Sequence, residues 1–561
     1  MTRSCLGLIV LFAGLATVML AGEPQATPTF HCIGLRWKPE TQETPPVCQV
    51  AYRIAGTSAD WREAQPLWFD SNDHTGAGAG HSREYRGSIV DLLPGTRYDV
   101  RLIRRGHPDH HLQVTTWSET FPIKERRLLP GGRSTEPLRL AEGGSRSEGY
   151  LLYESPPGNP TVIDVGELHE AAIRIEASFV ILRGVTVRGA RRHGITLGDV
   201  ADVIIERCDV SGWGRNKPGS AWGENLDSAI YSESPTLTRI VIQRCRLHHP
   251  RSDANSWAEN GHPEGPQAIT FRGSRGHLVI RYNEIFSDED HGFNDAMGEV
   301  ENFGYGGFPN RDADIYCNRI SHCWDDGIEA EGANLNVRIW GNQIERVFVA
   351  LGLATTSLGP QYVFRNVAGF SRKDPPGFGP APYPAGGYLF KLGTKRPRAD
   401  TLARGAVFLY HNTMLQPLFE GRPAGLRRGA YVTDRTYGVW NLTSRNNVLQ
   451  TRGPSDEAVR DPLAAAENSF DFDLYTGTVA AAPGAEANGF HSTPQFEARA
   501  SQAEPPLAPA IPGRDAALRL NNFNDRYRGS GPDVGAVEAG LLPLPSGVEA
   551  DWTDWLRRTG L

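Results

Sequence analysis

The chain has 561 residues, enough for two or more domains, and its 62 Gly and 40 Pro predict many turns and few long helices. We therefore expect an all-β protein. The formal net charge of −7 gives no basic surface for a nucleic acid, and a polyanionic substrate would need a local positive groove.

The amino terminus has the pattern of a secretory signal peptide, which we place at residues 1–22. Met1-Thr2-Arg3 is followed by an apolar run from Leu6 to Ala21 and then by small residues. The run is short for a spanning helix, and no other stretch approaches the roughly eighteen apolar residues that a bilayer needs. We expect a secreted or periplasmic monomer, with no membrane span after cleavage and no nucleic-acid partner.

Residues 27–123 predict a small β-domain. Short alternating strands are expected at Cys32–Trp37, Gln49–Ile54 and Leu92–Leu102, with turn signals between them. The segment Leu93-Pro-Gly-Thr-Arg-Tyr98, with Trp37 upstream, resembles the fibronectin type III family. The resemblance implies a β-sandwich in which Trp37 packs between the sheets and the Tyr98 hydroxyl bonds to the backbone. It also implies a domain that spaces or docks its neighbour.

Residues 124–148, rich in Arg, Gly and Glu, are interpreted as a linker into a repetitive region at 149–455. Eight segments of this region share one shape: an apolar strand, Cys or Asn at one ladder position, and an apolar residue two places on. The ladder positions are Cys208, Cys245, Asn283, Asn318, Asn342, Asn366, Asn412 and Asn446. A spacing of 24 residues occurs twice and longer spacings elsewhere, so the base period is about two dozen residues with insertions, as in a solenoid.

Stacked coils would bury the inner faces of these strands, which a single repeat cannot do. Ladder amides stacked at about the 4.8 Å strand spacing would hydrogen-bond along the axis. The strands resemble those of right-handed parallel β-helix proteins, the pectate-lyase-like superfamily, over about residues 130–540. Phe179–Val187 is similar to the opening coil of that fold, and Gly531–Glu538 resembles its closing Asp-x-Gly-Ala-x-Glu motif. The predicted fold class is therefore all-β, a β-helix solenoid after a fibronectin-like sandwich.

Six cysteines follow the signal peptide, and none has zinc spacing with histidine partners. Cys32 and Cys48 are compatible with a disulfide or with two free thiols. Cys208 and Cys245 occupy equivalent ladder sites, where we expect buried stacked thiols.

Acidic residues gather in two neighbouring repeats that align without a gap, Asn283–Asn294 and Asn318–Glu329. The alignment places Asp290 over Asp325, His291 over Asp326 and Asn294 over Glu329, about one strand spacing apart. One repeat earlier, Asp227, Tyr231 and Glu233 fall in the same register. Because side chains alternate in direction along a strand, Glu329 and Glu331 both face outward, roughly 7 Å apart.

These acids predict a polysaccharide-degrading hydrolase. A glycosidase needs one carboxyl to protonate the leaving oxygen and another to activate water, and stacking two carboxylates raises the pKa of one of them. Asp290 over Asp325 is the expected perturbed pair, Asp326 or Glu329 the base, and His291 an alternative proton donor. The expected substrate contacts are Asp227, Tyr231, Arg272, Asn294, Glu331 and Lys391. Trp213, Trp222 and Trp257 in nearby insertions are either packing residues or surfaces for sugar rings, and packing is the more frequent role of a single tryptophan.

Two other functions stay open, because the fold hosts several. A polysaccharide lyase would need a base such as Tyr231, Arg272 or Lys391, together with a cation that neutralises the uronate. We predict no cofactor for hydrolysis, and for a lyase a calcium site at Asp288, Asp290 and Asp325. A non-catalytic glycan-binding or surface-adhesion protein is the third possibility. A polysaccharide is the expected partner in each case.

Residues 456–561 are interpreted as a capping region. The open end of a solenoid needs a cover, since its exposed strand edge would recruit other strands. The segment 551–558 predicts a short helix.

Overall fold

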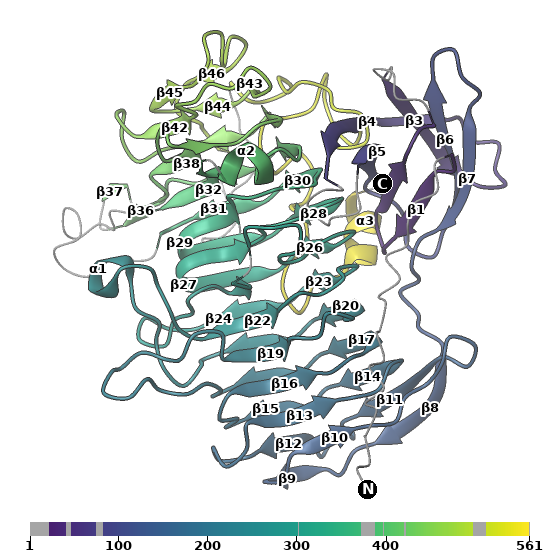
Figure 1. Cartoon of the computed structure of the whole chain (residues 1–561), viewed down its shortest axis with the longest axis vertical. Coiled ribbons are helices and arrows are strands. Elements are labelled where there is room, and N and C mark those ends of the chain that lie inside the picture. Colours follow the sequence, from purple (N-terminus) through teal and green to yellow (C-terminus); the bar gives the residue numbers. More distant parts are fainter. Residues whose placement is uncertain are drawn as a thin grey trace, which may run out of the picture.

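The computed structural model describes residues 22–40, 47–74, 82–300, 302–371, 387–396, 398–419, 422–423, 425–496 and 512–559. The predicted signal peptide, apart from its last residue, lies outside them. In these described ranges no helix is long and apolar enough to cross a bilayer. A tall stack of parallel strands stands beside a small antiparallel domain, and the C-terminal segment runs between the two (Figure 1).

The small domain comes first. Its strands are β1 (Gln25–Pro28), β2 (Ile33–Trp37), β3 (Cys48–Ile54), β4 (Arg62–Asp73), β5 (Ser82–Ile89), β6 (Arg97–Arg104) and β7 (His110–Thr115). They pair antiparallel in the order β1-β2-β5-β4-β3-β6-β7. Trp37 is buried and stacks on Tyr85, and the Tyr98 hydroxyl accepts a hydrogen bond from the Leu93 N–H at 2.8 Å. The backbone bond predicted for Tyr98 is confirmed, whereas the likeness to fibronectin domains stays a prediction.

The parallel strands wind into a β-helix whose coils present three faces. The first face consists of β8 (Ile123–Leu128), β11 (Tyr150–Glu154), β14 (Val180–Arg183), β17 (Ala201–Glu206), β20 (Thr238–Gln243), β23 (Val279–Arg281), β26 (Asp314–Tyr316), β28 (Val337–Trp340), β30 (Gln361–Phe364), β34 (Val407–Tyr410), β40 (Leu442–Arg445) and β43 (Ser469–Asp471). The second face consists of β9 (Gly132–Ser134), β12 (Thr161–Asp164), β15 (Thr186–Arg188), β18 (Asp209–Ser211), β21 (Arg246–His248), β24 (Glu284–Phe286), β31 (Val367–Gly369), β35 (Thr413–Met414), β41 (Val448–Leu449), β44 (Leu474–Tyr475) and β46 (Phe490–His491).

The third face carries the acidic residues. It consists of β10 (Leu138–Leu140), β13 (Ala171–Ile175), β16 (His193–Leu197), β19 (Ser228–Ser232), β22 (Gln267–Phe271), β25 (Met297–Gly298), β32 (Tyr388–Leu392), β38 (Arg428–Val432), β42 (Glu457–Arg460) and β45 (Thr478–Ala480). Two long strands, β27 (Arg319–Glu329) and β29 (Gln343–Leu353), start on the second face and continue onto the third.

A few short elements complete the chain. They are two short antiparallel pairs and three helices: β33 (Thr394–Lys395) with β39 (Tyr437–Gly438), β36 (Leu418–Phe419) with β37 (Arg422–Pro423), α1 (Trp257–Asn260), α2 (Arg398–Leu402) and α3 (Trp552–Thr559). The helix expected near residues 551–558 is α3.

The ladder of amides is confirmed. Asn283 donates from Nδ2 to the Oδ1 of Asn318 at 2.9 Å, and the same bond repeats from coil to coil at 2.9–3.0 Å. These side chains are fully buried, so each amide satisfies the next in the absence of water. The last rung is Asn447 instead of the predicted Asn446, because Asn446 takes the left-handed bend before the strand, with φ of 61°.

The β-helix is longer at both ends than the sequence predicts. Residues expected to form a linker at 124–148 make the first coil, since β8 pairs with β11 and β9 with β12. Most side chains of β8 are charged and exposed, so this segment lacks the alternation of apolar and polar residues by which a strand is predicted. At the other end the expected cap contains five more strands of the stack, from Glu457 to His491.

The small domain is docked on the first face. Arg281 of β23 is almost completely buried, donates to Glu119 at 2.6 Å and lies 3.7 Å from the ring centroid of Phe30. Loss of Glu119 would leave the Arg281 charge buried without its partner, and loss of Arg281 would uncover the face of the Phe30 ring. The contact therefore favours one fixed orientation of the small domain. Among the described residues Cys32 and Cys48 are both free, buried thiols, as are Cys208 and Cys245.

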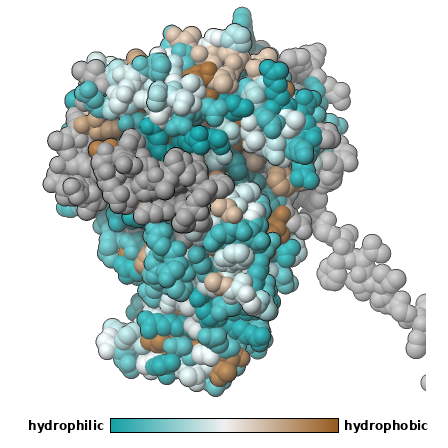
Figure 2. Space-filling view, turned by 90° about the vertical axis from the view of Figure 1, so that its left-hand side faces the viewer, coloured by the Kyte–Doolittle hydropathy of each residue, from teal (hydrophilic) through white to brown (hydrophobic). Residues whose placement is uncertain are grey.

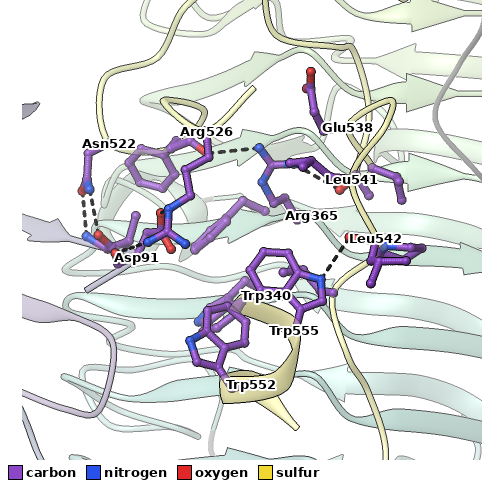
Figure 3. Close-up of a pocket in the computed structure, with 17 residues that line it drawn as sticks. Asp91, Trp340, Arg365, Asn522, Arg526, Glu538, Leu541, Leu542, Trp552 and Trp555 are labelled. Carbon is purple, nitrogen blue, oxygen red and sulfur yellow. Dashed lines mark hydrogen bonds and ion pairs between the residues drawn. The ribbon is translucent and has the colours of Figure 1, made fainter. Parts of the chain in front are cut away.

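Residues 512–559 pack at the junction between the small domain and the β-helix, and Val534 among them also packs against Val448 and Leu474 of the later coils. Figure 3 shows the place where the three parts meet around a cavity of about 70 Å³. There Arg526 of the tail lies 2.7 Å from Asp91 of the small domain, and Arg365 of the β-helix donates to the Ala536 carbonyl at 3.2 Å. Aromatic side chains on the outside of the first face, Trp340 among them, give Trp552 of α3 a surface to pack on.

Candidate active site

Five carboxyl groups and one ammonium meet on the third face. The residues are Asp295, Asp325, Asp326, Glu329, Glu331 and Lys391, supplied by the segments around β25, β27 and β32. Four of the acids are more than nine-tenths buried, and Glu329 and Lys391 are partly exposed. We call this set the acid cluster.

Direct contacts hold the acid cluster together. Lys391 donates from Nζ to Asp326 Oδ2 at 2.5 Å and lies 3.3 Å from Glu331 Oε1. Asn302 donates to Glu329 Oε1 at 2.6 Å and also reaches Glu331, which ties the two glutamates together. On the opposite side Asp295 Oδ1 accepts the backbone N–H of Asp326 at 2.8 Å.

The neighbouring coils leave space for these carboxylates. Gly298 of β25 and Gly352 of β29 lie beside the cluster, on the strands that flank β27. A Cβ built on Gly298 would overlap the Glu329 carboxylate, and one on Gly352 would overlap the Asp326 carboxylate. Glycine at both places therefore keeps the cluster from being filled by a side chain of an adjacent coil.

Burial raises the pKa of several of these acids. The pKa of Asp295 rises to about 8, first because the group is buried and then because the Asp325 carboxylate lies close by. Burial also raises the pKa of Asp326 and of Glu329 well above their usual values. For Lys391, burial by itself lowers the pKa, but the charges of Asp326 and Glu331 outweigh it and hold the ammonium in its charged form. The cluster thus keeps at least one carboxyl proton at neutral pH.

Aromatic side chains flank the acid cluster toward the later coils. Trp257 of α1 is partly exposed and donates from its indole N–H to Asp325 Oδ1 at 3.3 Å. Its ring is followed by those of Phe348, Tyr388 and Tyr431, with successive centroid separations of 6.1, 5.6 and 5.1 Å. We call these four rings the aromatic row. His262 Nε2 lies 3.7 Å from Asp325 Oδ2.

Two hollows lie on the earlier coils of the third face. One, of about 460 Å³, is lined by His193, Tyr231 and Glu233, and the next, of about 780 Å³, by Glu233, Arg272 and Phe303. Glu233 borders both, so they form one groove along the third face. Figure 2 shows the flank that carries α1 as predominantly hydrophilic, with hydrophobic residues in small separate spots.

The predicted stacking of Asp290 on Asp325 is wrong. The Asn294 carbonyl, expected over Glu329, accepts the Asp325 N–H at 3.0 Å instead, so the register is shifted by four to five residues. Phe293 pairs with Cys323, and residues 287–292 bulge outward as a turn that a gap-free alignment counts as strand. Asp290 is consequently 86% exposed on that turn.

His291 and Asp288 also lie on this turn, where His291 Nδ1 is 3.2 Å from Asp288 Oδ1. His291 is therefore no proton donor for the acid cluster. The carboxylate set predicted for calcium is divided, since Asp288 and Asp290 group with His291 while Asp325 contacts Trp257.

The predicted substrate contacts have mixed outcomes. Asp227 is completely buried and is bound by Arg215 at 2.9 Å and Arg192 at 3.4 Å, a structural role. Tyr231 and Arg272 line the groove. Glu331 and Lys391 belong to the acid cluster itself, and Asn294 is buried below it, donating to Asn225 at 3.3 Å.

Sequence reasoning missed Asp295 and Asn302. Asp295 directly follows Asn294, so its position would have followed from aligning the Asn-Asp pair with Asp325-Asp326 across a four-residue gap. Asn302 lies in an insertion and has no counterpart in other repeats.

A family model described as "Right handed beta helix region" matches residues 171–366, about a third of the chain. No curated protein matches the sequence. Three solved structures are similar, each at 10% identity. Pectate lyase Pel9A has a TM-score of 0.37, and the match covers 76% of this chain and 91% of that one. The family 28 exopolygalacturonase of Yersinia enterocolitica has a TM-score of 0.22, with 82% of this chain and 96% of that one covered, and the catalytic domain of a GH87 α-1,3-glucanase with tetrasaccharides has a TM-score of 0.27, with 82% and 90% covered. The fold is a right-handed parallel β-helix, and such distant likenesses say nothing about the reaction of this chain.

Proposed function

We propose that this protein is a secreted polysaccharide-degrading enzyme that hydrolyses glycosidic bonds at the acid cluster. The observation that carries the proposal is the pairing of a protonated acid, Asp295 with a pKa of about 8, with Asp326, whose carboxylate is bound by Lys391. Glycoside hydrolysis needs one carboxyl that gives a proton and one that takes it.

Asp295 donates its proton to the leaving glycosidic oxygen. Burial, together with the nearby Asp325 carboxylate, raises the pKa of Asp295 and keeps that proton on it up to a pH near 8. Asp326 acts as the base: burial raises its pKa, the Lys391 charge paired with its Oδ2 opposes that rise, and its buried Oδ1 has no hydrogen-bond partner among the described residues. That oxygen takes a proton from the attacking water, and direct attack by water inverts the configuration at the sugar carbon.

The surroundings suit a chain of sugars. Trp257, an exposed ring at the start of the aromatic row, offers a face on which the C–H face of a sugar packs, and its indole N–H ties that row to Asp325. On the other side of the cluster, Tyr231 and Arg272 present a hydroxyl and a guanidinium for sugar hydroxyls. A substrate lying along the third face would contact both flanks of the acids.

A lyase is less well supported. Its base must be uncharged, and the surrounding carboxylates keep Lys391 as an ammonium ion. Burial raises the pKa of Tyr231, and its hydroxyl already donates to Glu233 at 3.1 Å.

Export through residues 1–22 and a fibronectin type III-like identity of β1–β7 complete the proposal. Here the small domain would be held by the first face and the tail, and its His74 contacts Tyr305, a residue that lines the larger hollow.

A panel of neutral and uronate-containing polysaccharides tests the proposal. We expect new reducing ends without ultraviolet-absorbing unsaturated products, an inverted product anomer by NMR, and undiminished activity in EDTA. Asp326→Asn should abolish release of sugar, while Glu345→Gln, an exposed acid on β29, serves as the matched control. Unsaturated products would make the protein a lyase, and glycan binding without turnover on the whole panel would make it an adhesion protein.

A further inference from the structure

A short loop, residues 302–307, lies between the acid cluster and the larger of the two hollows. At its start Asn302 donates to Glu329 of the acid cluster at 2.6 Å. Phe303, which is 42% exposed, and Tyr305 both line the larger hollow. We call residues 302–307 the groove loop. Its position affects both the acids and the space beside them.

The β-helix fixes the backbone of the groove loop. Ser357 Oγ donates to the Gly304 carbonyl at 2.8 Å, and the Ala333 N–H donates to the Gly306 carbonyl at 2.6 Å. The Tyr305 ring packs against a buried apolar group that contains Ala333. These contacts hold the main chain and one side of the ring, and the Tyr305 hydroxyl bonds elsewhere.

The partner of that hydroxyl comes from the small domain. His74, directly after β4, has its Nδ1 3.2 Å from the Tyr305 hydroxyl, and the two rings meet edge to face with their centroids 5.3 Å apart. His74 Nε2 lies 2.7 Å from Asp70 Oδ2. The side chains of His74 and Asp70 are buried, so water does not compete for these bonds.

Asp70 keeps the His74 ring in this orientation. Arg86 of β5 is fully buried, donates to Asp70 Oδ2 at 2.9 Å and also donates to the Leu358 carbonyl of the β-helix. Burial by itself raises the pKa of Asp70, but the His74 hydrogen bond and the Arg86 charge outweigh it and lower the pKa. An ionised carboxylate can only accept, so His74 Nε2 carries a proton. His74 Nδ1 accepts from the Tyr305 hydroxyl when the ring is neutral and donates to it when the ring is protonated, so the bond forms in either state.

We infer that His74 is a positioning residue for substrate binding, because it fixes the groove loop through Tyr305 and so shapes the larger hollow. The inference rests on the proposed function, in which a sugar chain lies along the third face. The small domain then belongs to the binding site and does more than space or dock its neighbour. Loss of the contact should weaken substrate binding and leave the chemical step intact, since Asn302 keeps its own bonds to the two glutamates.

Two ring variants test the contact. His74→Phe keeps a ring in place but removes both nitrogen atoms, and Tyr305→Phe removes only the hydroxyl. Each should raise KM for the polysaccharide that the panel identifies about 2- to 10-fold, the effect of one buried hydrogen bond, with kcat changed less than about twofold. The double variant should raise KM no further, because both changes break the same bond.

Hydrogen–deuterium exchange supplies a measurement that needs no substrate. The amides of the groove loop should exchange faster in both variants than in the wild type. Tyr98→Phe is the matched control, since it also removes a buried hydroxyl bond of the small domain. It should keep the wild-type KM and the wild-type exchange of the groove loop, even where its melting temperature falls.

The outcomes separate this inference from the proposed function. No turnover on the polysaccharide panel would remove the proposed function, and exchange of the groove loop would still decide whether His74 positions it. Wild-type exchange in both variants, KM effects that add in the double variant, or the same rise in KM for Tyr98→Phe would each overturn the inference. If His74→Phe does not fold, Tyr305→Phe carries the test, because it leaves the contact between Asp70 and Arg86 in place.

Discussion

Asparagine in place of Asp295 removes the raised carboxyl pKa while keeping the shape of the side chain. The amide oxygen can still accept the N–H of Asp326, and Gln267, which now donates to Asp295 Oδ2 at 2.9 Å, can turn its own amide to match. If Asp295 is the proton donor, kcat should fall about 10²- to 10⁴-fold, the usual contribution of a general acid. The wild-type kcat/KM should decline as the pH rises through about 8.

The same variant makes a prediction that needs no substrate. The pKa of Asp295 rises from 3.8 to about 8 on folding, so its contribution to stability is complete below pH 3.8 and is lost as the pH rises through 8. Between those values the loss is about 1.4 kcal/mol per pH unit for a single independent group. The amide that replaces the carboxyl in Asp295→Asn does not titrate, so the difference between the two proteins isolates this group.

Melting curves of the wild type and Asp295→Asn at pH 5 and pH 9 provide the measurement. We expect the wild type to lose more apparent melting temperature between these pH values than the variant, with the variant the more stable protein at pH 9. Glu345→Gln, which removes an exposed carboxyl, should follow the wild type. Parallel curves for wild type and Asp295→Asn, or wild-type activity of the variant, would refute the assignment of Asp295.

Three further predictions concern the cluster and the ladder. Lys391→Met should lower the free energy of unfolding in urea by about 3–5 kcal/mol, because it leaves the buried Asp326 carboxylate unpaired, and adding Asp326→Asn should restore part of the loss. Trp257→Ala should raise KM about 5- to 10-fold through lost stacking, with an unchanged melting temperature; a fall in kcat alone would contradict a binding role. Asn342→Leu should cost about 1–3 kcal/mol of stability because it breaks the buried ladder, whereas the exposed Asn488→Leu should be neutral.

Local patterns were enough for the fold. The recurrence of apolar strands with an Asn ladder predicted the stacked coils, since identical side chains at one turn position satisfy one another only when the coils lie in register. The Tyr98 bond in the small domain followed in the same way from a short segment. The ends of the solenoid escaped prediction because charged, exposed side chains at residues 124–148 conceal strands whose backbone pairing is complete.

The sequence by itself determined that acids of adjacent coils collect on one face, and it named five residues of the final cluster: Asp325, Asp326, Glu329, Glu331 and Lys391. Only the tertiary structure decided which partner faces them. The pairing of Phe293 with Cys323 expels residues 287–292 from the coil, replaces Asp290 by Asp295 and leaves His291 on a partly exposed turn. The neighbours of a side chain in a solenoid depend on the length of each turn. That length depends on which apolar residue of the next strand enters the core. Core packing determines this residue, and the sequence alone does not reveal it.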